Sequence, residues 1–206
     1  MRTIVGVLFP VRCAICGGLG PSPCPRCIGD LERAPPQPVP LGLDDCWALL
    51  TYEGSARDLV ARVKYRNLRA SVPWLAEGIA ALVPAGAVEV VTWAPTSAPR
   101  RRRRGFDHAA VLAGAVARRL RVPSVALLDR GPGPPQTGRG RAERRRGPDL
   151  RPAPAARHWA GATVAVVDDV LTTGASLGAA ARALRAGGAG AVVGLVAART
   201  PNHPAG

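Results

Sequence analysis

Apolar residues occur along this chain in short unbroken runs and in longer stretches of helical period, and the two kinds alternate. A short apolar run bounded by turn residues is typical of a strand buried on both faces of a parallel sheet. Apolar residues that recur every three or four positions indicate an amphipathic helix. We therefore expect strands at residues 47–52, 88–93, 122–128, 164–167 and 191–197, and helices at residues 56–64, 74–83, 108–120 and from the turn at 172–176 to about residue 185.

The stretch from residue 163 to residue 176 joins the most apolar strand to a polar turn. The apolar run is followed by Asp168 and Asp169, and then by small and hydroxyl residues that lead into an alanine- and leucine-rich helix. We expect the strand to end at Val167. Both acids would then lie at the carboxyl edge of the sheet, where open α/β sheets bind their ligands.

The turn after the two acids has the composition of a phosphate-binding loop. Backbone N–H groups at a helix start point towards an anion, and the helix dipole favours its negative charge. Beside a bound phosphate, carboxylates can accept hydrogen bonds from ribose hydroxyls, directly or through Mg²⁺ and water. A helix-capping aspartate with a solvent-exposed neighbour is the simpler alternative, but it accounts for only one of the acids. The candidate phosphate-binding residues are Thr172, Thr173, Gly174, Ala175 and Ser176.

Two Cys-x-x-Cys pairs near the N-terminus, separated by seven residues, form a candidate metal site. Such knuckles can present four thiolates tetrahedrally to Zn²⁺, and four protein ligands leave no open position, so the zinc would be structural. Disulfides and an iron–sulfur cluster are the alternatives. The candidate ligands are Cys13, Cys16, Cys24 and Cys27.

A proline-rich segment at residues 34–40 follows the cysteine pairs. Segments of this composition act as stiff linkers, so we place a domain boundary there. The expected domains are residues 1–40, which hold the cysteine module and the linker, and residues 41–206, which hold the alternating strands and helices.

Basic residues outnumber acidic ones by 28 to 14 and give the chain a formal net charge of +14. This charge predicts attraction to polyanions such as nucleotides or nucleic acid. Arginines gather at residues 100–104, between an expected strand and an expected helix, and we expect Arg103 or Arg104 to contact an anion there. A solvated charge run is the alternative. Residues 131–148 form a long basic stretch without apolar period, and we expect residues 139–146 to belong to a mobile lid.

No apolar run approaches the ~18 residues of a membrane-spanning helix. Residues 3–11 are apolar but short, and Val11 and Arg12 do not form the small-residue cleavage site of a signal peptide. We therefore expect no membrane span and a cytoplasmic protein.

Taken together, these features resemble the ComF family of competence protein F-like proteins. The resemblance is carried by the cysteine knuckles, Arg-Gly-Phe-Asp-His at 104–108, Pro-Gln-Thr-Gly at 135–138 with Arg144 downstream, and Asp-Asp-Val-Leu-Thr-Thr-Gly at 168–174. The last of these resembles the phosphoribosyl pyrophosphate (PRPP) motif of type I phosphoribosyltransferases. The sequence departs from the family at His108, where Gln is usual, and at Gly147, where Asn is usual.

The resemblance implies an α/β fold. The implied architecture is a type I phosphoribosyltransferase-like (Rossmann-like), mostly parallel sheet flanked by helices, with a small N-terminal zinc-ribbon or knuckle module. It also implies that Asp168 and Asp169 hold the ribose of PRPP with Mg²⁺, that residues 172–176 hold the 5′-phosphate, and that the four cysteines hold a structural zinc. The residues implied in pyrophosphate or anion binding are Arg103, Arg104 and Arg144.

In function, the resemblance implies a protein that binds PRPP or a nucleotide and is linked to DNA uptake in natural competence. Single-stranded DNA and DNA-uptake proteins are the implied partners. Whether the protein transfers a phosphoribosyl group, and to which acceptor, is left open, and no catalytic residue is assigned. The alternative is a PRPP- or nucleotide-sensing DNA-binding protein without catalysis, although four Trp, two Tyr and two Phe offer few rings for base stacking.

Overall fold

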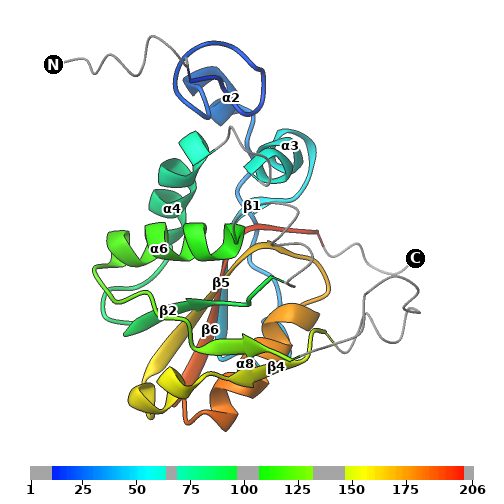
Figure 1. Cartoon of the computed structure of the whole chain (residues 1–206). Coiled ribbons are helices and arrows are strands. Elements are labelled where there is room, and N and C mark those ends of the chain that lie inside the picture. The colour runs from blue at the N-terminus through cyan, green and yellow to red at the C-terminus, as the bar shows by residue number, and fades with distance from the viewer. Residues whose placement is uncertain (1–10, 64–68, 97–106, 132–146, 202–206) are drawn as a thin grey trace, which may run out of the picture.

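The computed structural model of the chain describes residues 11–63, 69–96, 107–131 and 147–201. A parallel sheet with the strand order β1-β6-β5-β2 lies at its centre (Figure 1). Its strands are β1 (Asp45–Thr51), β2 (Val90–Trp93), β5 (Thr163–Leu171) and β6 (Ala191–Arg199). A second, antiparallel pair joins β3 (Leu128–Arg130) to β4 (Leu150–Pro152).

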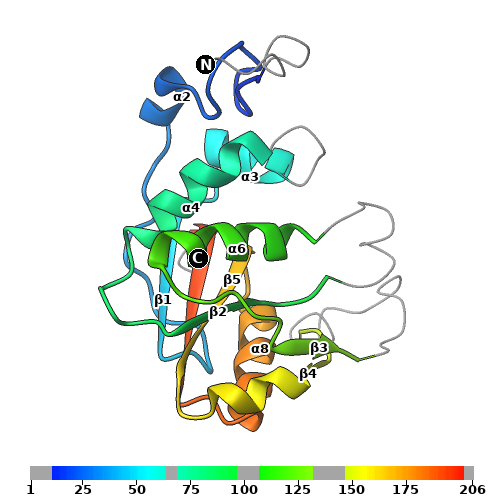
Figure 2. The ribbon, with the colours of Figure 1, turned by 60° about the vertical axis from the view of Figure 1, so that its left-hand side comes forward.

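Helices cover both faces of the parallel sheet, as Figures 1 and 2 show. One face carries α3 (Gly54–Val63), α4 (Val72–Ala80) and α6 (His108–Leu120), and the other carries α8 (Ala175–Ala186) with the β3–β4 pair. The described residues also form the short α2 (Pro25–Gly29) and the 3-10 helices η1 (Arg69–Ser71) and η2 (Pro154–Trp159). This arrangement confirms the predicted α/β class.

Strand β5 is buried on both faces because its apolar run faces two separate cores. Ala165 and Val167 pack with residues of α3, α4 and α6. Val164 and Val166 pack with residues of α8 instead. All four side chains are at most 1% exposed. Burying such a side chain contributes roughly 1.5–3 kcal/mol, which is why an unbroken apolar run specifies a central strand.

Two of the predicted strand boundaries were wrong. Strand β5 continues past Val167 to Leu171, because β6 extends alongside it and offers partners as far as Arg199. The expected strand at residues 122–128 is reduced to one bridge between Ser124 and Val91, and β3 starts only at Leu128. Pro123 has no N–H to donate, which limits pairing in this segment.

The proline-rich segment runs across the sheet and contacts it at several points. The Ala34 N–H donates to the Leu49 carbonyl, and the Thr51 N–H donates to the Glu32 carbonyl, so residues 32–34 line the open edge of β1. Further along, Pro40 lies against the turn at Gly174. The position of the domain boundary stays a prediction. Within the described residues, no helix combines the length and apolar character needed to cross a membrane.

Candidate functional site

The two acids lie side by side near the end of β5. Both are partly buried, and the Asp169 N–H donates to Asp168 Oδ1 at 2.8 Å. Beyond them the alternation of the strand shifts: Val170 packs on the same face as Val167, whereas Leu171 faces α8. The acid pair therefore occupies the point where the side-chain alternation of the strand changes. It lies at the carboxyl side of the sheet, although inside the strand and not beyond it.

The turn after β5 leads directly into the first residue of α8. Thr172 and Thr173 are exposed, and Gly174 precedes the helix with a φ of 74°. The first bond within the helix runs from the Gly178 N–H to the Gly174 carbonyl at 2.8 Å. The earlier N–H groups of the helix therefore face the turn, and that of Ala175 approaches Thr173 Oγ1 at 3.4 Å. This is the geometry of an anion site at a helix start.

Gly174 is required here for two reasons. Its φ is positive, a conformation that other residues adopt with difficulty. A Cβ at this position would also lie 3.0 Å from Pro40 Cβ and 3.7 Å from Leu171 Cδ1. The turn is therefore packed between the end of β5 and the proline-rich segment.

A second loop at the same edge follows β2. Asp107, which caps α6, accepts hydrogen bonds from the Ala109 N–H at 3.1 Å, the Thr96 N–H at 2.8 Å and Thr96 Oγ1 at 3.1 Å. Arg130 Nη1 donates to the Pro95 carbonyl at 3.1 Å from the other side. Because Trp93 pairs with Val167, this loop lies next to the acid pair. The sequence predicted the helix cap but not the bonds to Thr96.

Gly147 brings a third segment to the start of α8. Its φ is 74°, and a Cβ at this position would overlap the carbonyl oxygen of Ala175. Asn, the usual residue in the family that the sequence resembles, tolerates a positive φ but carries that Cβ. The close approach therefore explains the glycine.

The basic residues predicted to bind anions, Arg103, Arg104 and Arg144, lie outside the described residues, as does the expected lid at 139–146. Their roles stay predictions. His108, where the sequence departs from the family that it resembles, is buried, with only 6% of the residue exposed. As the first residue of α6, it continues the buried face that includes Leu112 one turn later.

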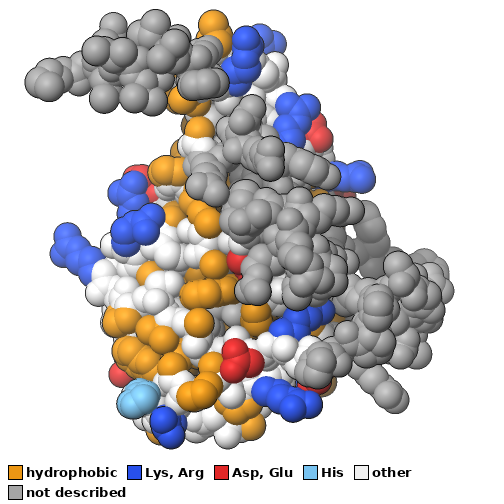
Figure 3. Space-filling view, in the orientation of Figure 1, with side chains coloured by type: hydrophobic (Ala, Val, Ile, Leu, Met, Phe, Trp, Pro, Cys, Tyr) orange, Lys and Arg blue, Asp and Glu red, His pale blue; other side chains and the backbone are white. Residues whose placement is uncertain are grey.

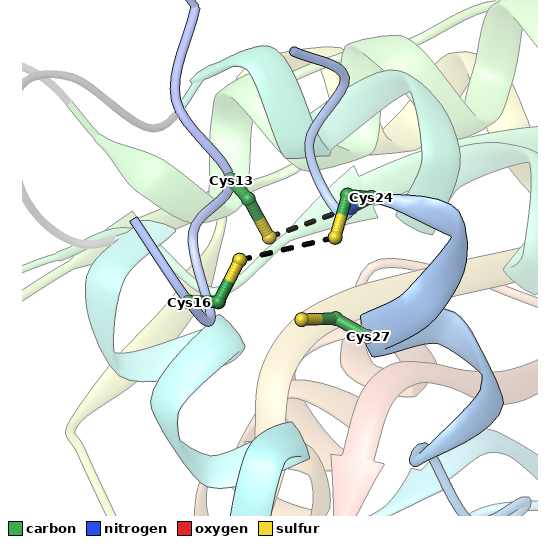
Figure 4. Close-up of side chains that lie close together, drawn as sticks. All are labelled: Cys13, Cys16, Cys24 and Cys27. Carbon is green, nitrogen blue, oxygen red and sulfur yellow. Dashed lines mark hydrogen bonds between the residues drawn. The ribbon is translucent and has the colours of Figure 1, made fainter. Parts of the chain in front are cut away.

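The four cysteines of the N-terminal module converge on one point (Figure 4). Their sulfur atoms all lie within 4.8 Å of one another, so they could hold a zinc ion. None of them forms a disulfide. The set is Cys13, Cys16, Cys24 and Cys27, the same residues that the sequence predicts.

The surroundings of this cluster suit a metal that binds thiolates. Burial by itself raises the pKa of Cys13, but backbone N–H groups of Cys16, Cys24 and Ile15 donate to its sulfur and lower the pKa to about 6. Burial and the neighbouring sulfurs raise the pKa of Cys27. The raised pKa of Cys27 opposes its ionisation, whereas a bound Zn²⁺ would favour the thiolate.

The cysteine module is packed against the α3–α4 side of the molecule. Ala14 is fully buried in the core that contains α4, and its N–H donates to Ser22 Oγ at 2.8 Å. Ser22 Oγ in turn lies 2.7 Å from Ser71 Oγ, in a buried hydrogen bond. Arg62 of α3 donates to the Ala14 and Ile15 carbonyls at 3.3 and 3.4 Å. No pattern in the sequence points to these serines, because they are 49 residues apart.

Comparison with known proteins bears on the second half of the chain. Residues 107–205 match the family model of the phosphoribosyl transferase domain. The matched segment contains α6, the acid pair, the turn at 172–174, α8 and β6. A comparison of the sequence with curated proteins finds no match.

Several solved structures are similar to the chain at low sequence identity. A glutamine PRPP amidotransferase from B. subtilis, complexed with ADP and GMP, is 21% identical with a TM-score of 0.50, over 71% of this chain and 32% of that chain. A structure of the allosteric regulatory enzyme of purine biosynthesis is 21% identical with a TM-score of 0.49, over 71% and 31%. A hypothetical protein from Neisseria gonorrhoeae with bound ppGpp is 15% identical with a TM-score of 0.38, over 79% and 78%.

The present chain thus spans about a third of the length of the first two of these proteins. The likeness to the B. subtilis protein, with its TM-score of 0.50, concerns the fold alone. Together with the domain match and the observed sheet, it identifies the fold as type I phosphoribosyltransferase-like, with a four-cysteine module at the N-terminal side.

Proposed function

We propose that the carboxyl edge of the sheet binds PRPP or a nucleotide together with Mg²⁺. The observation that carries this proposal is the order of groups along one strand and turn. The acid pair Asp168 and Asp169 stands directly ahead of the turn at 172–174 and the first N–H groups of α8. All of these lie within the segment that matches the phosphoribosyl transferase domain.

In this proposal the acid pair and the turn bind different parts of the ligand. The carboxylates accept hydrogen bonds from the ribose hydroxyls, and residues 172–176 donate N–H and hydroxyl groups to the 5′-phosphate. Bound Mg²⁺, which prefers carboxylate, phosphate and water oxygens, neutralises charge on the pyrophosphate. Arg103, Arg104 and Arg144 are proposed to contact the same group.

We further propose that the protein transfers the phosphoribosyl group to an acceptor. The bond between ribose C1 and the pyrophosphate oxygen breaks, the oxygen leaves with the electron pair, and a bond from the acceptor to C1 forms. The contribution of the protein is to hold the ribose in place and to stabilise the departing charge.

The ribose assignment can be tested with an isosteric double variant. Asp168→Asn with Asp169→Asn removes both charges and keeps the shape of the site. A lost charge-assisted hydrogen bond is worth ~1.5–3 kcal/mol, so PRPP affinity measured by calorimetry should fall about tenfold or more. Affinity for inorganic phosphate should change little, because the turn and the helix start remain. Equal PRPP affinity of the two proteins would show that the acids do not bind the ribose.

On the basis of the ComF resemblance, we propose that the protein is cytoplasmic and linked to DNA uptake. The net charge of +14 also supports a second candidate, a PRPP- or nucleotide-sensing protein that binds single-stranded DNA without catalysis. On the face drawn in Figure 3, however, the coloured arginines lie in separate groups, with hydrophobic, uncharged and acidic side chains between them. A continuous basic stripe is the usual mark of a nucleic-acid site, and this face does not present one in its coloured part.

Two measurements separate these candidates. Release of pyrophosphate from PRPP in the presence of candidate acceptors favours the transferase. Binding of a single-stranded oligonucleotide that weakens steeply with salt, without pyrophosphate release, favours the DNA-binding protein.

A further inference from the structure

A buried arginine ends the central strand β6 at the same edge as the proposed phosphate site. Arg199 is 8% exposed. Its backbone lies between Thr51 of β1 and Leu171 of β5, its partners in the two ladders. Its side chain donates from Nη2 to the Pro38 carbonyl at 2.6 Å.

Among the described residues, no carboxylate balances the charge of this guanidinium. Within the described parts of the chain, no carboxylate forms an ion pair with Arg199, and the Pro38 carbonyl is its only side-chain hydrogen-bond partner. A guanidinium carries several N–H donors, and burying its charge without a partner is costly. The Pro38 carbonyl is neutral and leaves the positive charge of Arg199 uncompensated. The position is therefore suited to a further partner that is an anion.

The side chain lies on the face of the sheet that carries α8. Leu171, directly opposite Arg199 in the parallel ladder, packs with α8 residues, and paired residues in a ladder point to the same face. Leu171 also lies next to the turn, with its Cδ1 3.7 Å from the Cβ position of Gly174. Figure 1 shows that α8 begins at the end of the sheet where β6 finishes.

The segment held by Arg199 reaches the same turn. Two residues after Pro38, Pro40 approaches the Cβ position of Gly174 at 3.0 Å. The buried guanidinium and the start of α8, which carries the positive end of the helix dipole, therefore both lie against the short segment from Pro38 to Pro40. Both groups are positive, so an anion bound between them would be attracted by both.

We propose that Arg199 is a buried cationic contact for the phosphate group that binds at the start of α8. This inference rests on the proposed function, in which that phosphate is the 5′-phosphate of a ribose. The guanidinium keeps its bond to Pro38 and donates its remaining N–H groups to the phosphate oxygens. The site then holds the phosphate between the helix start and a side chain of the neighbouring strand.

The test compares the wild type with Arg199→Gln, which removes the charge and keeps an amide N–H donor. Inorganic phosphate and ribose 5-phosphate are titrated into both proteins by calorimetry. Because the variant loses a charge-assisted contact, its affinity for both ligands should fall about tenfold or more. Arg185→Gln is the matched control. Arg185 lies in the last turn of α8, away from the proposed phosphate site at the first turn, and its loss changes the net charge equally. Its phosphate affinity should stay within about twofold of the wild type.

Each outcome decides between the two proposals. Equal phosphate affinity of Arg199→Gln and the wild type would refute the role of Arg199 and leave the proposed site in place. A wild type that binds neither phosphate, ribose 5-phosphate nor PRPP would refute both. If Arg199→Gln does not fold, a crystal structure of the wild type with phosphate decides. An oxyanion within ~3 Å of the guanidinium supports the inference, and an oxyanion at α8 without that contact refutes it.

Discussion

Gly147 shows how one missing side chain shapes the candidate site. It allows the chain entering β4 to lie against Ala175, the first residue of α8. The group that faces Gly147 is the backbone carbonyl of Ala175, which belongs to the proposed phosphate-binding loop. This carbonyl cannot move without moving the start of α8.

Gly147→Ala should destabilise the protein more than its backbone conformation alone requires. The positive φ costs about 1–2 kcal/mol for a residue with a Cβ, and the overlap with the Ala175 carbonyl adds to it. We expect a loss of at least about 2 kcal/mol in the free energy of unfolding, measured with urea. Gly161→Ala is the control, since Gly161 has a φ of 78° but nothing within 4 Å of its Cβ position. Similar losses in the two variants would contradict the contact.

At the scale of single residues, the sequence predicts those functional groups whose members lie close together along the chain. The acid pair, the hydroxyl turn and the cysteines could be found because each set is close in the sequence and its residue types are specific. Arg199 with Pro38 and Ser22 with Ser71 could not, because 161 and 49 residues separate the partners. Such contacts depend on how whole elements pack, and a single sequence carries no pattern for them.

Among the elements, α8 and β6 are joined at the end opposite the candidate site. Asp44 accepts hydrogen bonds from the Val192 N–H at 2.7 Å and from Arg185 Nη2 at 2.6 Å. The backbone bond from Val192, followed by the bond from Arg185, lowers the pKa of Asp44. This carboxylate therefore connects the last turn of the helix to the first residues of the next strand.

The contribution of Asp44 to stability should depend on pH. A lowered folded-state pKa means that the stabilisation is complete above the unfolded pKa, about 3.9, and is lost as the pH falls through the folded pKa. Because the side chain is 46% exposed, we expect Asp44→Asn to cost only about 1 kcal/mol near pH 7. Urea unfolding near pH 7 and near pH 3 should show the difference from the wild type shrinking at the lower pH.

A matched variant separates this effect from a general loss of negative charge. Glu77 pairs with Arg119 at 3.3 Å, but both side chains are well exposed. Glu77→Gln should therefore leave the stability nearly unchanged at both pH values. A cost for Asp44→Asn that stays the same at low pH would contradict the assignment.

Element types were easier to predict than their ends. Helix α6 begins and ends as expected, since Asp107 supplies a local cap and the apolar period is regular. The end of β5 was misplaced because the polar pair was taken as the strand boundary, whereas the ladder with β6 continues beyond it. Strand ends depend on the partner strand, which the sequence of one segment does not contain.

In the whole molecule, the cysteine module and the main sheet share a core. Ala14 is buried with residues of α4, and Ser22 bonds Ser71 just before that helix. Disturbing the cysteine cluster should therefore affect more than the module itself.

We propose one structural Zn²⁺ at the four cysteines, and elemental analysis should find about one zinc per chain. Cys13→Ser, or chelation, should increase hydrogen exchange at Ser71 and in the first turn of α4. Amides in the middle of α8, on the opposite face of the sheet, serve as the internal control. Metal-free protein with the same exchange at both places and an unchanged melting temperature would contradict the proposal.

The strip formed by residues 32–34 has a consequence for aggregation. It hydrogen-bonds to the outer edge of β1 through the Leu49 carbonyl and the Thr51 N–H. An uncovered edge strand offers its free backbone groups to strands of other molecules. A shortened protein that starts at residue 41 would lose this cover together with the cysteine module. In the full chain, the N-terminal segment therefore protects the edge of β1 from self-association. Light scattering of the shortened chain should reveal oligomers that the full chain does not form.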